Sequence, residues 1–168
     1  MYKIMLADDE GIVIDSVKFI IEKEFGDECI IEFAKTGRSV IELAETFRPD
    51  IAIMDIQMPG INGIDSMKEI RKNNNNVVFI VMSAYDKFDY AKEAIKLGVL
   101  EYLTKPMERT KLVTVLRKAM DIVEKETIKE VPGEYWQKSY GCNSCGYNNW
   151  GTNWNRPFIP ARRGVAVA

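Results

Sequence analysis

Two short segments of the chain are almost entirely apolar and rich in β-branched residues, and they constrain the fold more than any other feature. They are Ile51–Met54 and Val77–Met82. A strand without a polar face has to be covered on both sides, which is typical of the strands of a parallel sheet. Less uniform segments of the same kind occur at Lys3–Ala7, Cys29–Phe33 and Leu100–Leu103. The sequence therefore predicts five strands.

Stretches with helical spacing of apolar residues separate and follow these strands. Their apolar positions recur every three or four residues: Val13, Val17, Ile20 and Ile21; Val40, Leu43, Ala44 and Phe47; Ile64, Met67 and Ile70; Ala91, Ala94 and Ile95; Leu112, Leu116, Ala119 and Val123. A strand–helix unit repeated five times predicts right-handed βαβ crossovers. We therefore expect an α/β fold, a flavodoxin-like doubly wound sheet of five parallel strands, (βα)5, in three layers.

The charge and composition exclude several classes of function. The chain has 168 residues, a net charge of −2 and no histidine. Without histidine it has no Ser-His-Asp or Cys-His triad, and a general base must be a carboxylate, Lys, Tyr or Cys. Residues 1–126 hold 18 Lys or Arg against 23 Asp or Glu, whereas residues 127–168 hold 5 against 2. The chain therefore has an acidic body and a mildly basic tail.

Several features favour a cytoplasmic protein that does not contact membranes. The sequence contains no apolar run of the roughly 18–20 residues that cross a bilayer. The N-terminus becomes acidic at Asp8-Asp9-Glu10, before the apolar stretch of a secretion signal could form. The three cysteines are an odd number, which argues against a complete disulfide framework.

Chemically active side chains follow four of the predicted strands. Asp8 and Asp9 follow the first, Asp55 ends the third, Ser83 follows the fourth and Lys105 the fifth. Taken singly, each is an ordinary cap, turn or surface residue. Together they lie at the sheet edge where open α/β folds bind ligands. Clustered carboxylates favour a hard cation such as Mg²⁺, and a carboxylate at the end of a central strand can act as a nucleophile toward a phosphoryl group.

These residues stand in motifs that resemble the receiver domain of two-component response regulators. The motifs are Leu6-Ala7-Asp8-Asp9-Glu10, Asp55-Ile56-Gln57-Met58-Pro59-Gly60-Ile61-Asn62-Gly63, Ser83-Ala84-Tyr85 and Glu101-Tyr102-Leu103-Thr104-Lys105-Pro106. The resemblance covers residues 1–126, and residues 83–107 are most similar to receivers that precede an AraC-type helix-turn-helix output domain. Residues 127–168 form a Gly-, Asn- and Trp-rich tail that we expect to be no independent domain.

The resemblance implies a role for each residue of the metal and phosphoryl site. Asp55 would be phosphorylated. Asp9, Asp55 and the backbone carbonyl of Gln57 would coordinate Mg²⁺ directly, with Asp8 acting through a water ligand.

The resemblance also implies how the site acts as a switch. Ser83 and Lys105 would contact the phosphoryl oxygens, and a cis peptide bond to Pro106 would hold Lys105. Ser83 and Lys105 would reach those oxygens by moving their loops inward. Tyr102 would be the switch aromatic, changing rotamer as Ser83 moves.

The function that the resemblance implies is that of a two-component response regulator. A sensor histidine kinase, necessarily a separate protein, would donate the phosphoryl group to Asp55. The surface of the fourth helix, fifth strand and fifth helix would then contact a second copy of the chain, a downstream target or an output domain. Residues near that surface are Lys87, Tyr90, Glu101 and Lys111. We expect no enzyme beyond self-phosphorylation from small donors and loss of that phosphoryl group.

Two alternatives of other classes stay open at this point. One is a DNA-binding transcription regulator whose output domain is missing or replaced by the tail, so that DNA is bound only if an output domain is present elsewhere. The other is a phosphatase with an aspartate nucleophile, which Gln57 disfavours because an acid would be needed two residues after Asp55. In the tail, Cys142 and Cys145 are a CxxC pair for which we expect no metal or redox role within one chain, because a zinc site would need a second chain to supply the other two ligands. The tail could also be a flexible segment, a non-native extension or a surface that stacks on single-stranded nucleic acid.

Overall fold

Five parallel strands form one sheet in the computed structural model, which describes residues 1–84 and 88–130. The strands are β1 (Tyr2–Ala7), β2 (Cys29–Ala34), β3 (Ile51–Asp55), β4 (Val78–Ser83) and β5 (Glu101–Thr104). Their order is β2-β1-β3-β4-β5, which is the flavodoxin-like order. Each predicted strand is confirmed, with ends that differ by no more than one residue.

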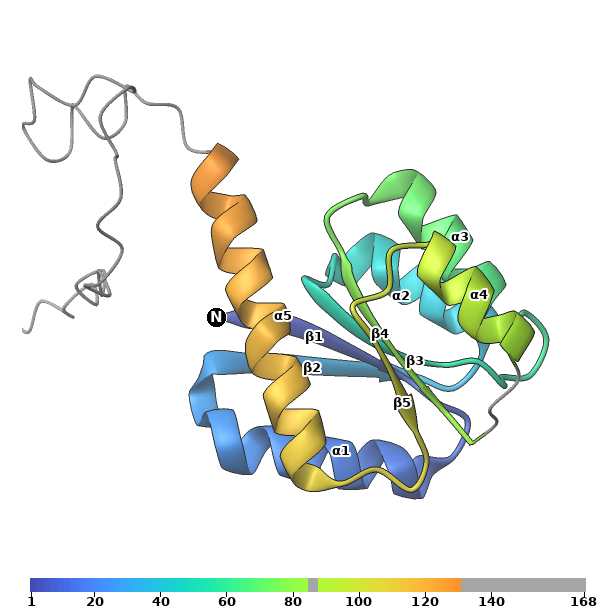
Figure 1. Ribbon diagram of the computed structural model, residues 1–168, viewed down its shortest axis with the longest axis horizontal. Helices are drawn as coiled ribbons and strands as arrows, with labels where there is room; N and C mark the ends of the chain where they lie inside the picture. The colour runs from blue at the N-terminus through green and yellow to red at the C-terminus, as the bar shows by residue number, and fades with distance from the viewer. Residues whose placement is uncertain (85–87, 131–168) are drawn as a thin grey trace, which may run out of the picture. The chain divides into compact units, whose positions relative to one another are not determined.

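The helices cover both faces of the sheet, as the predicted three layers require. They are α1 (Gly11–Phe25), the short 3-10 helix η1 (Gly26–Glu28), α2 (Gly37–Phe47), α3 (Gly63–Asn73), α4 (Phe88–Lys96) and α5 (Arg109–Glu130). Figure 1 shows α1 and α5 on one face, and α2, α3 and α4 on the other. In the described ranges, no helix is both long and apolar enough to cross a membrane.

The alternation of side chains along each strand divides the apolar core in two. In β3, Ile51 and Ile53 pack in the cluster beneath α1 and α5, whereas Ala52 and Met54 pack in the cluster beneath α2, α3 and α4. All five residues of β3 are buried. The apolar composition that predicted a doubly covered strand is therefore explained, because successive side chains of a strand point to opposite faces.

Helix α5 continues to Glu130, past residue 126 where the family resemblance ends. The domain boundary expected at residue 126 stays a prediction. Residues 131–168 of the tail, Cys142 and Cys145 included, lie outside the described residues. Cys29, the first residue of β2, is half-buried, and burial raises the pKa of its thiol to about 11.

The beginning of α3 lies directly against the end of β3. The Asn62 side chain caps the helix by accepting a hydrogen bond from the backbone N–H of Asp65 at 2.8 Å. The N–H of Gly63 donates to the carbonyl oxygen of Ile56 at 2.9 Å. A Cβ atom on Gly63 would lie only 2.0 Å from the carbonyl oxygen of Asp55. Glycine is therefore required here, because a side chain would push α3 away from the strand that carries Asp55.

We predict that Gly63→Ala lowers the free energy of unfolding by about 2 kcal/mol or more, the usual scale for overpacking. Gly11→Ala is the matched control, because its Cβ would meet only the Lys35 ammonium nitrogen at 3.4 Å. This control should leave stability nearly unchanged. Urea unfolding followed by circular dichroism measures both, and equal midpoints for Gly63→Ala and the parent protein would contradict the close contact.

Candidate functional site

Three carboxylates meet at the carboxyl edge of the sheet. Asp8 and Asp9 directly follow β1, and Asp55 is the last residue of β3. The two strands are parallel neighbours, with Ala7 opposite Met54. One carboxylate oxygen from each aspartate lies within 4.8 Å of the others. Asp8 and Asp55 are buried, whereas Asp9 is exposed. The structure therefore brings together the three acids that the sequence places at this edge.

The ammonium group of Lys105 bridges two of these carboxylates. Its Nζ atom lies 2.7 Å from Oδ2 of Asp8 and 2.9 Å from Oδ2 of Asp55, and the lysine side chain is only 13% exposed. Glu10 approaches the same nitrogen at 3.9 Å. The peptide bond between Lys105 and Pro106 is cis, as expected.

The ammonium group of Lys105 contacts Asp55 in this structure. The physical reason is that two buried carboxylates attract a cation before any phosphoryl group is present. The inward movement of its loop toward the oxygens of a phosphoryl group stays a prediction. Neither the pair with Asp8 nor the approach of Glu10 was predicted. They carry no local sequence signal, because β5 is separated from β1 by two strands.

Burial and charge act against each other on the ionisable groups. Burial raises the pKa of Asp8 above its usual value, although Lys105 and the backbone N–H of Glu10, which donates to Asp8 Oδ1 at 2.9 Å, both oppose the rise. Burial alone would lower the pKa of Lys105, but the adjacent carboxylates of Asp8 and Asp55 outweigh it and raise that pKa. Lys105 is therefore a fixed cation at neutral pH.

The donor set suits a hard divalent cation. Within the described part of the chain, Oδ2 of Asp8 is a buried oxygen that accepts no hydrogen bond of acceptable geometry, although the Lys105 ammonium lies beside it. Asp55 Oδ1 accepts a hydrogen bond from the backbone N–H of Gln57 at 3.2 Å. Carboxylate oxygens with unused lone pairs, one of them exposed to water on Asp9, are the ligands that Mg²⁺ prefers.

Ser83 and Tyr102 lie on the two strands beside the acidic cluster. Ser83 ends β4 and is 1% exposed, and its carbonyl oxygen accepts a hydrogen bond from the Lys105 N–H at 2.9 Å. Tyr102 lies in β5 opposite Val81 and packs, half-buried, against the core beneath α2, α3 and α4. The backbone therefore connects Ser83 directly to the residue that pairs with Asp55.

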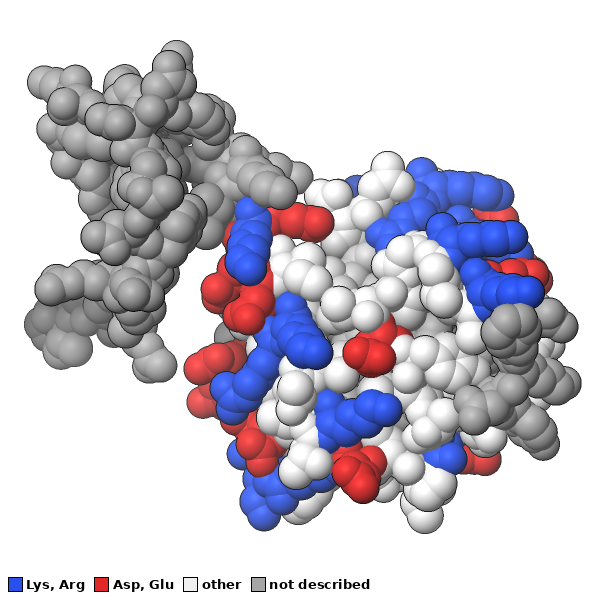
Figure 2. All heavy atoms as spheres, in the orientation of Figure 1, with Lys and Arg blue, Asp and Glu red and all other residues white. Residues whose placement is uncertain are grey.

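The surface expected to signal carries charges of both signs. A shallow groove of about 340 Å³ between β5 and α5 is lined by Glu101, Glu108, Thr110, Lys111, Thr114, Val115 and Lys118. Figure 2 shows acidic and basic side chains interleaved on this face. Tyr90 packs against the core beneath α2, α3 and α4, and Lys87 lies outside the described residues.

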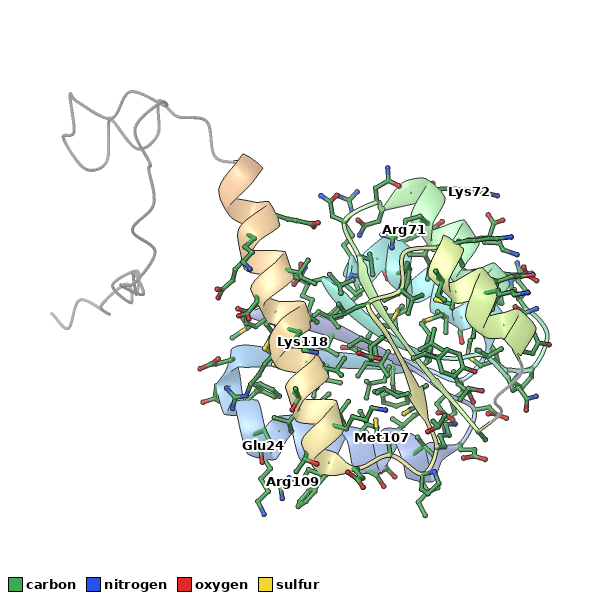
Figure 3. The ribbon with its side chains drawn as sticks, in the orientation of Figure 1. Glu24, Arg71, Lys72, Met107, Arg109 and Lys118 are labelled. Carbon is green, nitrogen blue, oxygen red and sulfur yellow. The ribbon has the colours of Figure 1, made fainter. Side chains whose placement is uncertain are left out.

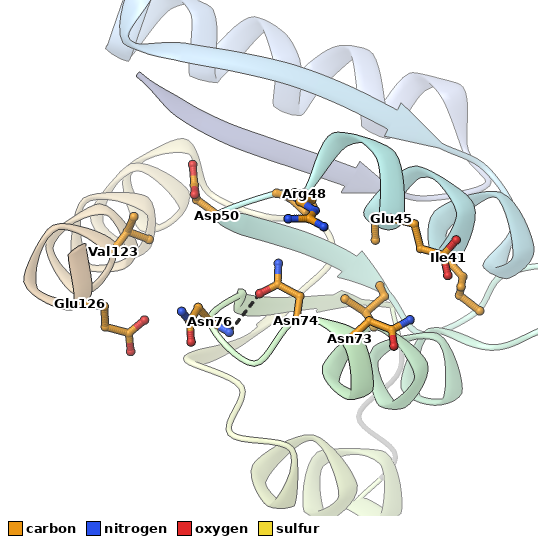
Figure 4. Close-up of a pocket in the computed structure, with 12 residues that line it drawn as sticks. Ile41, Glu45, Arg48, Asp50, Asn73, Asn74, Asn76, Val123 and Glu126 are labelled. Atoms are coloured by element: carbon orange, nitrogen blue, oxygen red, sulfur yellow. Dashed lines mark hydrogen bonds between the residues drawn. The ribbon is translucent and has the colours of Figure 1, made fainter. Parts of the chain in front are cut away.

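A larger hollow of about 580 Å³ lies at the opposite edge of the sheet and was not predicted (Figure 4). It lies between the carboxyl-terminal ends of α2 and α3 and the side of α5, with Arg48, Asp50 and Glu126 among its lining residues. One carboxylate oxygen of Asp50 already accepts the backbone N–H of Lys3 at 2.8 Å. Because it lies at the amino ends of the strands, this hollow is separate from the acidic cluster.

Comparisons with known proteins agree with this geometry. Residues 4–117 match the family model of the response regulator receiver domain. The chain is 38% identical over 133 residues to YesN of Bacillus subtilis, an uncharacterized transcriptional regulatory protein, and 37% identical over 118 residues to the transcriptional regulatory protein HptR of Staphylococcus aureus. These matches cover 76% and 69% of this chain, but only 36% and 45% of the two relatives. The chain thus spans less than half the length of either relative.

Solved structures show the same likeness. The receiver domain of AraT, a response regulator from Geobacillus stearothermophilus, is 36% identical with a TM-score of 0.68, over 75% of this chain and 98% of that domain. The receiver domain of a LuxO repressor protein from Vibrio parahaemolyticus has a TM-score of 0.72 at 24% identity, over 78% of this chain and 98% of that one. The second likeness supports the fold alone.

We predict that Lys105→Met lowers the free energy of unfolding by about 3 kcal/mol in a metal-free buffer, because it leaves buried carboxylates without a counter-charge. Combining it with Asp8→Asn should cost less than the sum of the two single changes, with a coupling of roughly 1–3 kcal/mol. Denaturant unfolding of the parent, both single variants and the double variant measures this cycle.

Lys68→Met is the matched control for the loss of a lysine. Lys68 pairs with Asp65 at 2.9 Å and Glu93 at 3.3 Å, but its side chain is 45% exposed. Its removal should therefore cost much less stability than the removal of Lys105. Strictly additive losses for Lys105→Met and Asp8→Asn would show that the two groups do not interact.

Proposed function

Because this chain belongs to the response regulator receiver domain family, we propose that Asp55 accepts a phosphoryl group and that the domain acts as the receiver of a two-component response regulator. The observation that carries the proposal is the arrangement around Asp55. Its carboxylate lies at a strand end, beside two further aspartates and 2.9 Å from a lysine ammonium. This is an arrangement that combines a carboxylate nucleophile with nearby positive charge for an incoming phosphoryl group.

The proposed reaction is a direct phosphoryl transfer. A carboxylate oxygen of Asp55 attacks phosphorus, a P–O bond forms, and the bond from phosphorus to the donor group breaks, so that the donor leaves with that electron pair. Lys105 faces the Asp55 carboxylate and stays protonated, and so can stabilise negative charge on the transferring oxygens. This sequence has no histidine, so a histidine that donates the phosphoryl group would lie outside it.

Mg²⁺ belongs to the same proposal. Asp8, Asp9, Asp55 and the backbone carbonyl of Gln57 are the groups that would hold it, with Asp8 acting through water. When bound, the ion would neutralise the mutual repulsion of the carboxylates and the charge of the phosphoryl oxygens.

The proposed output follows from the charge that phosphorylation adds. A phosphoryl group brings about −1.5 to −2 charges and three acceptor oxygens. The Ser83 hydroxyl would turn toward these oxygens, and the Tyr102 ring, packed beside β4, would change rotamer into the space that opens. The surface of α4, β5 and α5 would change with them and contact a second copy of the chain, a separate target or an output domain.

The partners of the whole protein are proposed on the same basis. A sensor histidine kinase is the phosphoryl donor that membership of the receiver family implies, and a cytoplasmic location stays part of the proposal. The names of YesN and HptR favour, as a second candidate, a role in transcription, in which DNA would be bound by an output domain outside the described residues. An output domain of AraC type stays a prediction.

Incubation with Mg²⁺ and a small phosphodonor such as acetyl phosphate should raise the intact mass by one phosphoryl group. Asp55→Asn should abolish the gain, because it removes the nucleophilic carboxylate. Asp50→Asn is the matched control, since Asp50 lies at the amino end of the same strand and its amide could still accept the Lys3 N–H. An unchanged mass of the parent protein, or an undiminished gain in Asp55→Asn, would refute the proposal.

Mg²⁺ alone should stabilise the protein without any phosphodonor. At a concentration about 100 times the dissociation constant, linkage predicts a gain of roughly 2.7 kcal/mol, seen as a higher thermal midpoint. Asp9→Asn should lose most of this gain, whereas Asp27→Asn, an exposed acid in η1, should keep it. A midpoint that does not respond to Mg²⁺ would contradict the proposed metal site even if phosphorylation occurs.

A further inference from the structure

The guanidinium group of Arg71 joins two turns that are far apart in the sequence. Arg71 lies in the last turn of α3 (Figure 3). Its Nη1 atom donates to the carbonyl oxygens of Asn75 at 2.5 Å and Val77 at 2.9 Å, in the turn that leads into β4. Its Nη2 atom donates to the carbonyl oxygen of Leu97 at 3.2 Å, directly after α4. One side chain therefore ties the end of α4 to the start of β4.

The packing around Arg71 makes this connection rigid. The guanidinium carbon lies 4.7 Å from the centre of the Phe79 ring, which is completely buried in the core beneath α2, α3 and α4. Burial lowers the pKa of Arg71 although Glu126 acts in the opposite direction, and the group stays charged at neutral pH. The three carbonyl acceptors and the Phe79 ring against its face together fix the orientation of the planar guanidinium group.

The Leu97 carbonyl is a favourable place to hold a helix. The last carbonyl groups of a helix lack intrahelical partners and carry its negative dipole end, so a cation there stabilises the helix. The backbone around this carbonyl is ordered by hydrogen bonds from the Leu97 N–H to Glu93 at 3.1 Å and from the Val99 N–H to Ala94 at 3.2 Å. Lys68 adds a weaker connection from α3 to Glu93, because that ion pair is exposed.

The proposed phosphorylation acts on the amino-terminal end of α4, opposite the end that Arg71 contacts. Ser83 ends β4 at the acidic cluster, and α4 begins five residues later, at Phe88. We propose that Arg71 is a positioning residue that holds the carboxyl-terminal end of α4, so that a rearrangement at Ser83 is taken up at the amino-terminal end and the helix pivots about Leu97. The inference rests on the proposed function of Asp55.

Hydrogen–deuterium exchange of the full chain, with and without acetyl phosphate and Mg²⁺, tests the pivot. In the parent protein, phosphorylation should change the exchange of amides in the first turns of α4 and leave those of Leu97 and Val99 protected. In Arg71→Met, phosphorylation should also raise the exchange of these two amides, by roughly tenfold, because the charged hydrogen bond to the Leu97 carbonyl no longer opposes movement of this end of the helix. Lys72→Met, the matched control on the next residue, loses only an exposed pair with Glu69 and should behave like the parent.

Each other outcome overturns the pivot. Equal effects of Arg71→Met with and without phosphorylation would show a merely structural role, and a parent protein that loosens at both ends of α4 would show that Arg71 holds nothing. If Arg71→Met does not fold, Arg71→Lys replaces it, because lysine keeps the charge but cannot donate to three carbonyl groups in the same geometry. Phosphorylation of Arg71→Lys should raise the exchange of the same two amides by a smaller factor. The absence of any rise would overturn the proposal. Intact mass recorded in parallel distinguishes a failure of the proposed function from a failure of the pivot. A parent protein that gains no phosphoryl group refutes the function of Asp55. A phosphorylated Arg71→Met whose amides exchange as in the parent refutes the pivot alone.

Discussion

The contacts of the Lys105 ammonium with Asp8 and Asp55 are the interaction on which the carboxyl edge of the sheet depends. Two buried carboxylates next to an exposed third would repel one another strongly in a medium of low polarity. The lysine, almost as buried as its partners, compensates that charge at 2.7 and 2.9 Å. The contacts cross from β5 to β1 and β3, so they also hold together strands that are not neighbours. A group that adds or removes charge at Asp55 therefore acts on the whole edge.

Helix α3 connects this edge to the opposite edge of the sheet, where the strands begin. Its first residue, Gly63, lies so close to the carbonyl of Asp55 that only a hydrogen atom fits between them. Its last turn carries Arg71, which holds the turn before β4 and the carbonyl that ends α4. The two ends of one helix are thus fixed in different ways, by steric contact at the proposed phosphoacceptor and by hydrogen bonds at the far side. Such a helix is a firm reference against which α4 can move.

The site and the surface differ in how strongly their charges are coupled. Beside Asp55, Asp8 and Lys105 are largely buried and shift each other's pKa, whereas the charges along β5 and α5 lie in a shallow groove. Exposed charges contribute little to stability but determine which surfaces attract one another.

The sequence by itself determined the five strands, their parallel arrangement and the residues at their carboxyl ends. Apolar runs and strand-end acids carry these features locally, and a parallel sheet necessarily brings its carboxyl ends to one edge. Only the tertiary structure decided that Lys105 already rests between Asp8 and Asp55, and that Arg71 bonds to three carbonyl groups. The physical reason is that every residue has a backbone carbonyl, so the sequence does not indicate which carbonyl groups accept from Arg71. In the same way, the contacts of a long side chain across intervening strands depend on tertiary packing, which no local sequence pattern records.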